Sequence, residues 1–272
     1  MERAAFTPEG FGHISSVWQG QHKGESNNMK SALIITGQPR TMEFCYPSLK
    51  RHILDVYKPD VFLVSDAEES RMIELFNPVR IDIRRQEEID IRYKTLRLRY
   101  TAPDREPVAA KDLSCAWKVY RASQLKQDFE SRFEFIYDVV LITRFDVKFH
   151  CVPEIKTPEP NTLHIPRRGA YWITPPDKPG IHWHGYSAHL CWMPSPVADQ
   201  LAGIYFQGED NFKIASEVAE WGYIPEHVTK NYCDRAGIRA VFEDMDMMLI
   251  RGTNEAPLSF QSTPLKDYPD YL

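Results

Sequence analysis

Long hydrophobic runs are missing from this sequence, and their absence argues against a protein whose helices cross a membrane. No stretch approaches the roughly 20 consecutive apolar residues that a helix needs to cross a bilayer. The first 30 residues also hold no continuous apolar segment of signal-peptide length. We therefore expect a protein without a membrane span, and the cytoplasm is the simplest location for it.

Cysteine is scarce, and the spacing of the cysteines is not that of a disulfide framework or a zinc site. The five cysteines are odd in number and include no Cys-x-x-Cys pair. Disulfide frameworks use even numbers of cysteines and zinc sites use close pairs. Most of the five lie in apolar contexts, where a thiol behaves as a small hydrophobic group. The sequence thus predicts a reduced, cytosolic-type protein with neither disulfides nor a structural zinc site.

An excess of positive charge is also lacking. The net charge is −5, which argues against nucleic-acid binding over the whole surface, because that binding needs Lys and Arg to neutralise phosphates. The hydrophobic share of 43% and the charged share of 26% fit a globular chain. The length of 272 residues suffices for one large domain.

Short apolar runs alternate with helical patterns through the first half of the chain. Apolar strands joined by helices predict a parallel sheet with helices on both faces, which is the α/β class. In the helical pattern that follows the first strand, one face carries Cys45, Leu49, Ile53 and Val56. The strand patterns are 32–37, 60–66, 79–85 and 138–143, and the helical patterns are 41–60, 72–76 and 111–135.

The second half is less regular. Residues 150–187 are rich in proline, histidine and aromatic residues and show little periodicity. Beyond them we expect a strand at 188–193, helices at 195–206 and 225–237, and closing strands at 238–242 and 246–251. The expected organisation is one domain over 31–252, with halves 31–150 and 151–252, a poorly ordered arm at 1–30 and a tail at 253–272.

Polar clusters follow three of the predicted strands: TGQPR (36–40), SD (65–66) and TRFD (143–146). Ligands of open α/β sheets bind beyond the carboxyl ends of the strands. An arginine such as Arg144 can pair bidentately with phosphate, and a carboxylate such as Asp146 can hold a divalent cation. The alternative is an ion pair between these two side chains.

The neighbouring charges have two interpretations as well. Gly37 permits a tight turn or a close approach of backbone to ligand. Arg40, near a helix N-terminus where anions are favoured, is either a ligand contact or a solvated side chain. Asp66 either contacts a ligand or caps the next helix. Lys118 and Arg121 could add positive charge, although a solvated helix face is the simpler expectation for both.

The segments SALIITGQPRTMEFCYPSLKRHILDVYKPDVFLVSD (31–66) and YDVVLITRFDVKF (137–149) resemble glycosyltransferases with a nucleotide-diphospho-sugar fold, the GT-A type. The similarity is to a bacterial and viral group that opens with strand-Gly-x-x-Arg and often writes its Asp-x-Asp stretch as Arg-x-Asp. It covers about residues 31 to 251.

The resemblance implies a GT-A-like fold, a nucleotide-diphosphate sugar as donor, and Mn²⁺ or Mg²⁺ as cofactor. Asp146 takes the position of the usual metal ligand. Arg144 replaces the first acidic residue of the motif, and its guanidinium can itself neutralise part of the diphosphate. The implied nucleotide-sugar-binding residues are Thr36, Gly37, Arg40, Ser65, Asp66, Arg144 and Asp146.

The resemblance also extends to IPEHVTKNYCDRAGI (224–238), where an acidic residue opens a helix that closes on Gly-Ile. In inverting members this residue is the base that deprotonates the acceptor hydroxyl, and Glu226 holds its position. The alternative is a glutamate that only favours the helix dipole. Asp210, in QGEDN (207–211), is the rival base, with Glu209 behind it.

The most unusual composition lies at GIHWHGYSAHLCW (180–192). His182 and His184 share one face if the stretch is extended, and Trp183 or Tyr186 can stack on a sugar ring. We interpret these four residues as a wall for the acceptor or the donor sugar. One alternative is that the histidines are metal ligands, and the other is that all four are ordinary core residues.

The resemblance implies a glycosyltransferase that moves a sugar from a nucleotide-diphosphate sugar to a glycan or other hydroxyl acceptor. Its base would be a carboxylate, so inversion is the expected stereochemistry. Two alternatives stay open. One is a catalytically degenerate domain that binds sugar nucleotides or glycans. The other is a nucleotidyltransferase, which would usually carry a glycine-rich phosphate loop that TGQPRTM (36–42) lacks.

Overall fold

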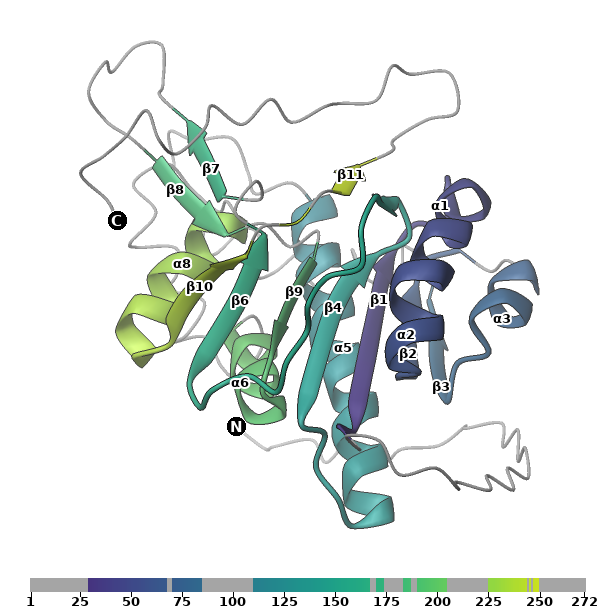
Figure 1. Ribbon diagram of the computed structural model, residues 1–272, viewed down its shortest axis with the longest axis horizontal. Coiled ribbons are helices and arrows are strands. Elements are labelled where there is room, and N and C mark those ends of the chain that lie inside the picture. The colour runs from purple at the N-terminus through teal and green to yellow at the C-terminus, as the bar shows by residue number, and fades with distance from the viewer. Residues whose placement is uncertain are drawn as a thin grey trace, which may run out of the picture.

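A mixed seven-stranded sheet forms the centre of the computed structural model (Figure 1). Its strand order is β3-β2-β1-β4-β9-β6-β10. The structure describes residues 29–67, 70–84, 110–166, 170–173, 183–186, 190–204, 225–243, 245 and 247–249. The strands of the large sheet are β1 (Ser31–Gly37), β2 (Asp60–Ser65), β3 (Arg80–Ile83), β4 (Val139–Arg144), β6 (Thr162–Pro166), β9 (Leu190–Met193) and β10 (Arg239–Glu243).

The large sheet is mostly parallel. Strand β1 pairs in parallel with both β2 and β4, β2 pairs in parallel with β3, and β6 with β10. Strand β9 is antiparallel to its neighbours β4 and β6. Two small antiparallel sheets pair β5 (Val147–Phe149) with β11 (Met247–Leu249) and β7 (Ala170–Ile173) with β8 (Trp183–Tyr186). The predicted α/β class is therefore confirmed.

Alternate residues of the central strands feed two separate cores, because successive side chains of a strand point to opposite faces. Ala32 and Ile34 belong to the core on one face, and Leu33 and Ile35 to the core on the other. Helices α5 (Ala110–Phe133), α6 (Ser195–Ile204) and α8 (Pro225–Ala236) contribute to the first core, whereas α1 (Met42–Leu49), η1 (Lys50–Leu54) and α3 (Ser70–Phe76) contribute to the second. The sheet is thus covered on both faces, as predicted.

The predicted helix at 41–60 is α1, the π-helical segment η1 and the short α2 (Asp55–Tyr57) in succession. Cys45, Leu49 and Ile53 are buried as expected. Val56 is 47% exposed, so its assignment to that face is wrong. A π-helical turn hydrogen-bonds from i to i+5 and is wider than an α-turn, which changes the direction in which the following residue points.

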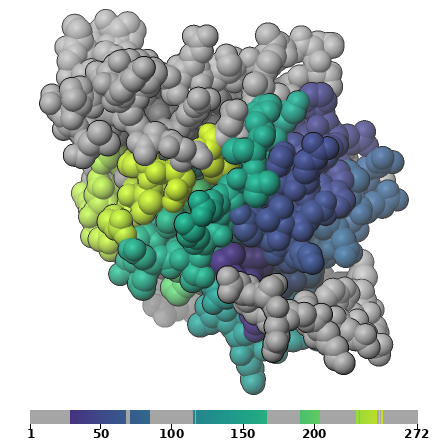
Figure 2. Space-filling model, viewed as in Figure 1, coloured from purple at the N-terminus to yellow at the C-terminus, as the bar shows by residue number. Residues whose placement is uncertain are grey.

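The segment after β5 lies against this helical region on the face shown in Figure 2. The hydroxyl of Tyr57 donates to the carbonyl of Pro153 and accepts from the backbone N–H of Ile155. The hydroxyl of Ser48 accepts from the backbone N–H of Phe149 at 3.1 Å. These contacts fix α1 beside the polypeptide that leaves β4.

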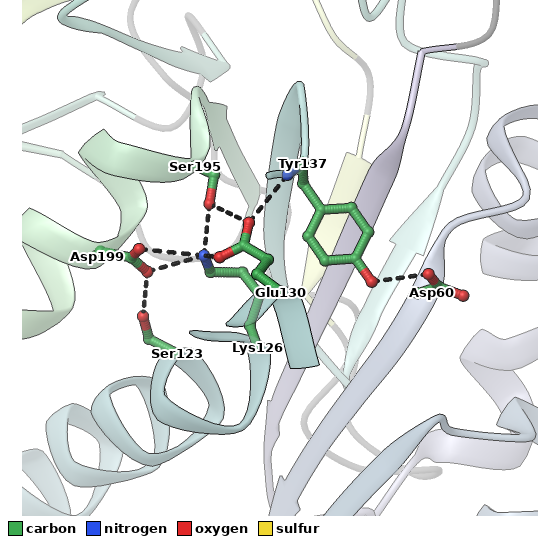
Figure 3. Close-up of polar contacts among 7 residues, drawn as sticks. All are labelled: Asp60, Ser123, Lys126, Glu130, Tyr137, Ser195 and Asp199. Carbon is green, nitrogen blue, oxygen red and sulfur yellow. Dashed lines mark hydrogen bonds and ion pairs between the residues drawn. The ribbon is translucent and has the colours of Figure 1, made fainter. Parts of the chain in front are cut away.

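A buried polar network joins α5, α6 and the start of β4 at the amino-terminal edge of the parallel strands (Figure 3). The ammonium of Lys126, which has no exposed surface, donates to Glu130 at 2.6 Å and to Asp199, and also to the hydroxyl of Ser195. Glu130 in turn accepts from Ser195 and from the backbone N–H of Tyr137. Every donor of the ammonium has a partner, which is the condition under which a charge can be buried.

No helix among the described residues is long and apolar enough to cross a membrane. All five cysteines are free thiols. Burial raises the pKa of the Cys45 thiol to about 11 and the pKa values of Cys191 and Cys233 to about 12. The predicted arm at 1–30, loop at 86–110 and tail at 253–272 lie almost wholly outside the described residues.

Candidate functional site

The three polar clusters predicted at strand ends converge at one edge of the sheet. Strands β2, β1 and β4 are adjacent and parallel, and Thr36 lies opposite Arg144 while Gly37 lies opposite Ser65. The chain runs from β1 to β2 on one side and returns to β4 on the other, so the strand order reverses between β1 and β4. Such a switch point is where open α/β sheets bind ligands. Figure 1 shows this edge beside the start of α1.

Arg144 and Asp146 pair with each other across a tight turn. The guanidinium donates through Nε to Oδ1 at 2.8 Å and through Nη2 to Oδ2 at 2.7 Å. Phe145, between them, is 3% exposed and packs edge-on against Phe76 at 5.7 Å between ring centroids. The aromatic ring anchors the turn in the core, and the two charges stay at the surface of the strand end.

Asp66 lies below this edge rather than in solvent. Its carboxylate accepts from the ammonium of Lys118 at 2.7 Å and from the amide of Gln38 at 3.2 Å, both through Oδ2. Oδ1 is buried and has no hydrogen-bond partner among the residues that the structure describes. The side chains of Asp66 and Lys118 are 2% and 3% exposed. The expectation that Lys118 lies on a solvated helix face is therefore wrong.

Arg121, one turn further along α5, is also paired. It donates through Nε to Asp82 at 2.6 Å, and Asp82 accepts from Arg84 at 3.2 Å as well. The guanidinium of Arg84 lies 5.5 Å from the ring centroid of Trp117. The solvated helix face expected for Arg121 is wrong for the same reason. Residues three apart on a helix lie on the same face, and this face of α5 packs against β1, β2 and β3.

The loop after β1 turns sharply into α1. Gly37 has a φ of +117°, which is a backbone conformation that side-chain-bearing residues rarely adopt. Thr36 is buried, Arg40 is exposed, and α1 begins two residues later at Met42. The charge of Asp146 contributes to the raised pKa of Cys45, after burial. Helix α1 contacts β5, the strand that begins directly after Asp146.

The predicted base lies on a helix of the expected kind. Glu226 is the second residue of α8, which starts at Pro225, and Gly237 follows its end with a φ of +67°. Trp183, His184 and Tyr186 lie on β8, which contacts α8. The side chains of these four residues, and the residues His182, Glu209 and Asp210, lie outside the described part.

The described side chains offer no ready shell for a divalent cation. Among them, no three His, Cys, Asp or Glu side chains lie close enough to hold a metal ion. Asp146, the implied metal ligand, already directs both oxygens at Arg144. In this structure the carboxylate of Asp146 is engaged by an arginine and is not open to a cation.

Comparison with known proteins adds no assignment. The sequence matches no protein-family model, and it matches no curated protein. The inference about function consequently rests on the residues at the strand ends.

Proposed function

We propose that the protein is a GT-A-like glycosyltransferase that binds a nucleotide-diphosphate sugar at the carboxyl edge of β1, β2 and β4. The observation that carries the proposal is the convergence of Gly37, Ser65 and Arg144 at the point where the strand order reverses. Arg40 follows three residues after Gly37, in the loop that leaves β1. Their order in the sequence is that of the resemblance, and parallel pairing of the three strands brings their ends to one edge.

Arg144 is the residue best suited to the diphosphate. A guanidinium is planar, always charged and able to donate two parallel hydrogen bonds to one oxyanion. It already binds the carboxylate of Asp146 in that geometry, and its side chain is 32% exposed. The exposed Arg40 and the N-terminus of α1 lie in the adjoining loop, where an anion is favoured.

The buried Asp66–Lys118 pair supports the floor of the site. Asp66 fixes the loop after β1 through Gln38 and the helix α5 through Lys118. The unpartnered Oδ1 gives this carboxylate one remaining acceptor position. Because the side chain is only 2% exposed, we propose that Asp66 positions the loop after β1 and does not itself touch the ligand.

The chemistry would be a single displacement. The acceptor hydroxyl attacks the anomeric carbon of the donor sugar, and the bond from that carbon to the diphosphate oxygen breaks. The proton of the hydroxyl passes to a carboxylate base, for which we propose Glu226, with Asp210 as the rival. Arg144 stabilises the negative charge that develops on the leaving diphosphate. A divalent cation, Mn²⁺ or Mg²⁺, would supply further neutralisation if the donor brings one with it.

One observation favours a second candidate function. The carboxylate of Asp146 pairs with Arg144, as a strand-end ion pair in a domain without a donor would do. A degenerate domain that binds a sugar nucleotide or a glycan without transfer would share the sheet and the switch point. It would lack turnover.

Calorimetric titration with UDP and with GDP, each in the presence of Mn²⁺ and of EDTA, tests the proposal. We expect one nucleotide to bind and Arg144→Gln to weaken its binding at least tenfold. The matched control is Arg239→Gln. Arg239 is the first residue of β10 and its guanidinium pairs with Glu159, so this variant should leave the nucleotide affinity unchanged.

A panel of nucleotide-diphosphate sugars then separates the two functions. Transfer or slow hydrolysis of one sugar supports the transferase, whereas tight binding without turnover of any sugar supports the binding domain. If neither nucleotide binds in either condition and no sugar is turned over, the transferase and the sugar-nucleotide-binding domain are both wrong.

A further inference from the structure

We infer that Asp146 is an internal counter-ion that occupies the anion-binding face of Arg144, and that a diphosphate binds by displacing it. The inference rests on the proposed function and assigns Asp146 a role opposite to that of a metal ligand. A metal ligand would strengthen diphosphate binding. A competing carboxylate weakens it.

The geometry of the pair is that of anion recognition. Two parallel hydrogen bonds, of 2.8 Å through Nε and 2.7 Å through Nη2, join one edge of the guanidinium to both carboxylate oxygens. Arginine binds carboxylate and phosphate oxygens with this same two-pronged arrangement. Asp146 therefore uses hydrogen bonds of Arg144 that a phosphate group would use, and the two anions compete for them.

The turn holds the competitor at the site. Phe145 is buried between the two charged residues and packs against Phe76. Val147, which follows Asp146, is 1% exposed and starts β5. With both flanking residues anchored in the core, the backbone of Asp146 stays beside Arg144, and only a side-chain rotation separates the carboxylate from the guanidinium.

The exposure of the pair allows that exchange. The side chain of Arg144 is 32% exposed and that of Asp146 is 14% exposed, unlike the Lys118–Asp66 pair below, whose side chains are almost inaccessible. A partly exposed ion pair contributes little net free energy, because water competes with the partner. A diphosphate, which carries more negative charge than one carboxylate, can therefore replace Asp146.

The displaced carboxylate would not be left without a partner of opposite charge. Lys148 lies two residues further along β5, and its ammonium is 4.9 Å from the ring centroid of Phe44 in α1. Strand β5, which carries Lys148, contacts α1. Once displaced from Arg144, the carboxylate of Asp146 would have this ammonium and solvent as alternative partners.

The test is the affinity of the full chain for inorganic pyrophosphate and for UDP and GDP, measured by calorimetry in EDTA. Asp146→Asn keeps the shape of the side chain and removes its charge. We expect it to bind pyrophosphate about two- to fivefold more tightly than the wild type, which corresponds to the free energy of a partly exposed ion pair. Asp146→Ser should do the same, and it serves as the second variant if the first does not fold.

Two further variants test whether the gain in pyrophosphate affinity acts through Arg144. Asp55→Asn removes a carboxylate paired with Lys50 at the end of the helical region, so it makes the same change in net charge and should leave pyrophosphate affinity unchanged. Arg144→Gln combined with Asp146→Asn should abolish the gain, since the gain acts through the guanidinium.

The outcomes separate this inference from the proposed function. Equal or weaker pyrophosphate binding by both Asp146 variants overturns the inference, as does absence of pyrophosphate binding in every protein. If the Asp146 variants bind pyrophosphate more tightly but no protein binds UDP, GDP or a nucleotide sugar, the counter-ion role stands and the proposed function is wrong.

Discussion

Lys118 and Asp66 form an ion pair of 2.7 Å directly after the end of β2, and their side chains are only 3% and 2% exposed. The pair connects α5 to the end of β2, and Gln38 joins it from the loop after β1. Three segments far apart in the sequence are thus held by one carboxylate. We therefore expect loss of the Lys118–Asp66 ion pair to displace the ends of β1 and β2.

The variant Lys118→Met tests this connection. It keeps the volume of the side chain but leaves the carboxylate of Asp66 buried without its cation. Breaking a buried pair on one side costs about 3–5 kcal/mol, so we expect a loss of that size in the free energy of unfolding, measured with urea. The control Lys50→Met breaks a pair whose side chains are 48% and 56% exposed, and it should cost less than about 1 kcal/mol.

A double variant completes that experiment. Lys118→Met combined with Asp66→Leu removes both charges, and an apolar replacement of a buried pair is often neutral. We expect it to regain most of the lost stability. A double variant as unstable as the single one would show that Lys118 acts through packing and not through its charge.

Much of the first half of the fold is predictable from the sequence because its signals are local. Strands β1 and β4 are short apolar runs buried on both faces, and that pattern is nearly independent of what surrounds them. The convergence of Thr36 and Arg144 then follows from parallel pairing. Strand β1 begins one residue before the predicted range of 32–37, and β4 is shifted by one residue from the predicted range of 138–143.

The missed features depend on partners distant in the sequence. Strand β6 contains His164 and ends at Pro166, so its sequence lacks the alternation of an isolated strand. Its pairing with β9 and β10 defines it, and His164 stacks on Trp192 of β9 at 5.3 Å between ring centroids. The helical pattern of α5 places Lys118 in solvent because nothing in that pattern shows that Asp66 faces it. The available signal is a pair of acidic residues on adjacent strands, Asp66 directly after β2 and Asp82 within β3.

The backbone conformation of Gly37 provides a second prediction. Alanine at this position meets no atom within 4 Å, so the cost of Gly37→Ala comes from the φ of +117° alone. We expect the free energy of unfolding to fall by about 1–3 kcal/mol. Relief of that strain would move the loop that carries Arg40, so binding of the nucleotide should weaken as well.

The matched control for Gly37 is Gly237→Ala. Gly237 also has a positive φ, of +67°, and open space around its Cβ position, but it follows α8. It should lower stability by about 1–2 kcal/mol and leave nucleotide affinity unchanged. Equal loss of affinity in both variants would attribute the effect at Gly37 to general destabilisation.

Alkaline pH should destabilise the protein through its buried phenol and thiols. Burial, followed by the hydrogen bond to Asp60 at 2.7 Å, raises the pKa of Tyr137 well above its usual value of 10.0. The unfolded chain therefore loses this proton at a lower pH than the folded protein does. The stability contribution is complete below about pH 10 and falls as pH rises further, by at most about 1.4 kcal/mol per pH unit for one group.

Urea unfolding between pH 8 and pH 11 measures this effect. Burial raises the pKa values of Cys191 and Cys233 from 9.0 to about 12. The free energy of unfolding should therefore begin to fall near pH 9 in the wild type and in Tyr137→Phe. Tyr137→Phe should lower stability by a constant amount below that pH, because it removes one hydrogen bond worth about 0.5–1.5 kcal/mol. Above pH 10 its curve should fall less steeply than that of the wild type. Parallel curves over the whole range would contradict the role of Tyr137.

The final prediction concerns the base of the proposed transfer. Glu226→Gln replaces a carboxylate that can accept a proton with an amide that cannot, and it preserves the length of the side chain in the first turn of α8. A general base contributes about 10²- to 10⁴-fold to rate. We expect the turnover of the nucleotide sugar to fall by that factor. Calorimetric binding of the nucleotide should stay the same, because the proposed donor site is at the carboxyl ends of β1, β2 and β4.

Asp210→Asn, tested beside it, should retain turnover if Glu226 is the base. A large loss in Asp210→Asn with normal rates in Glu226→Gln would transfer the role to Asp210, and the glutamate would then only favour the dipole of its helix.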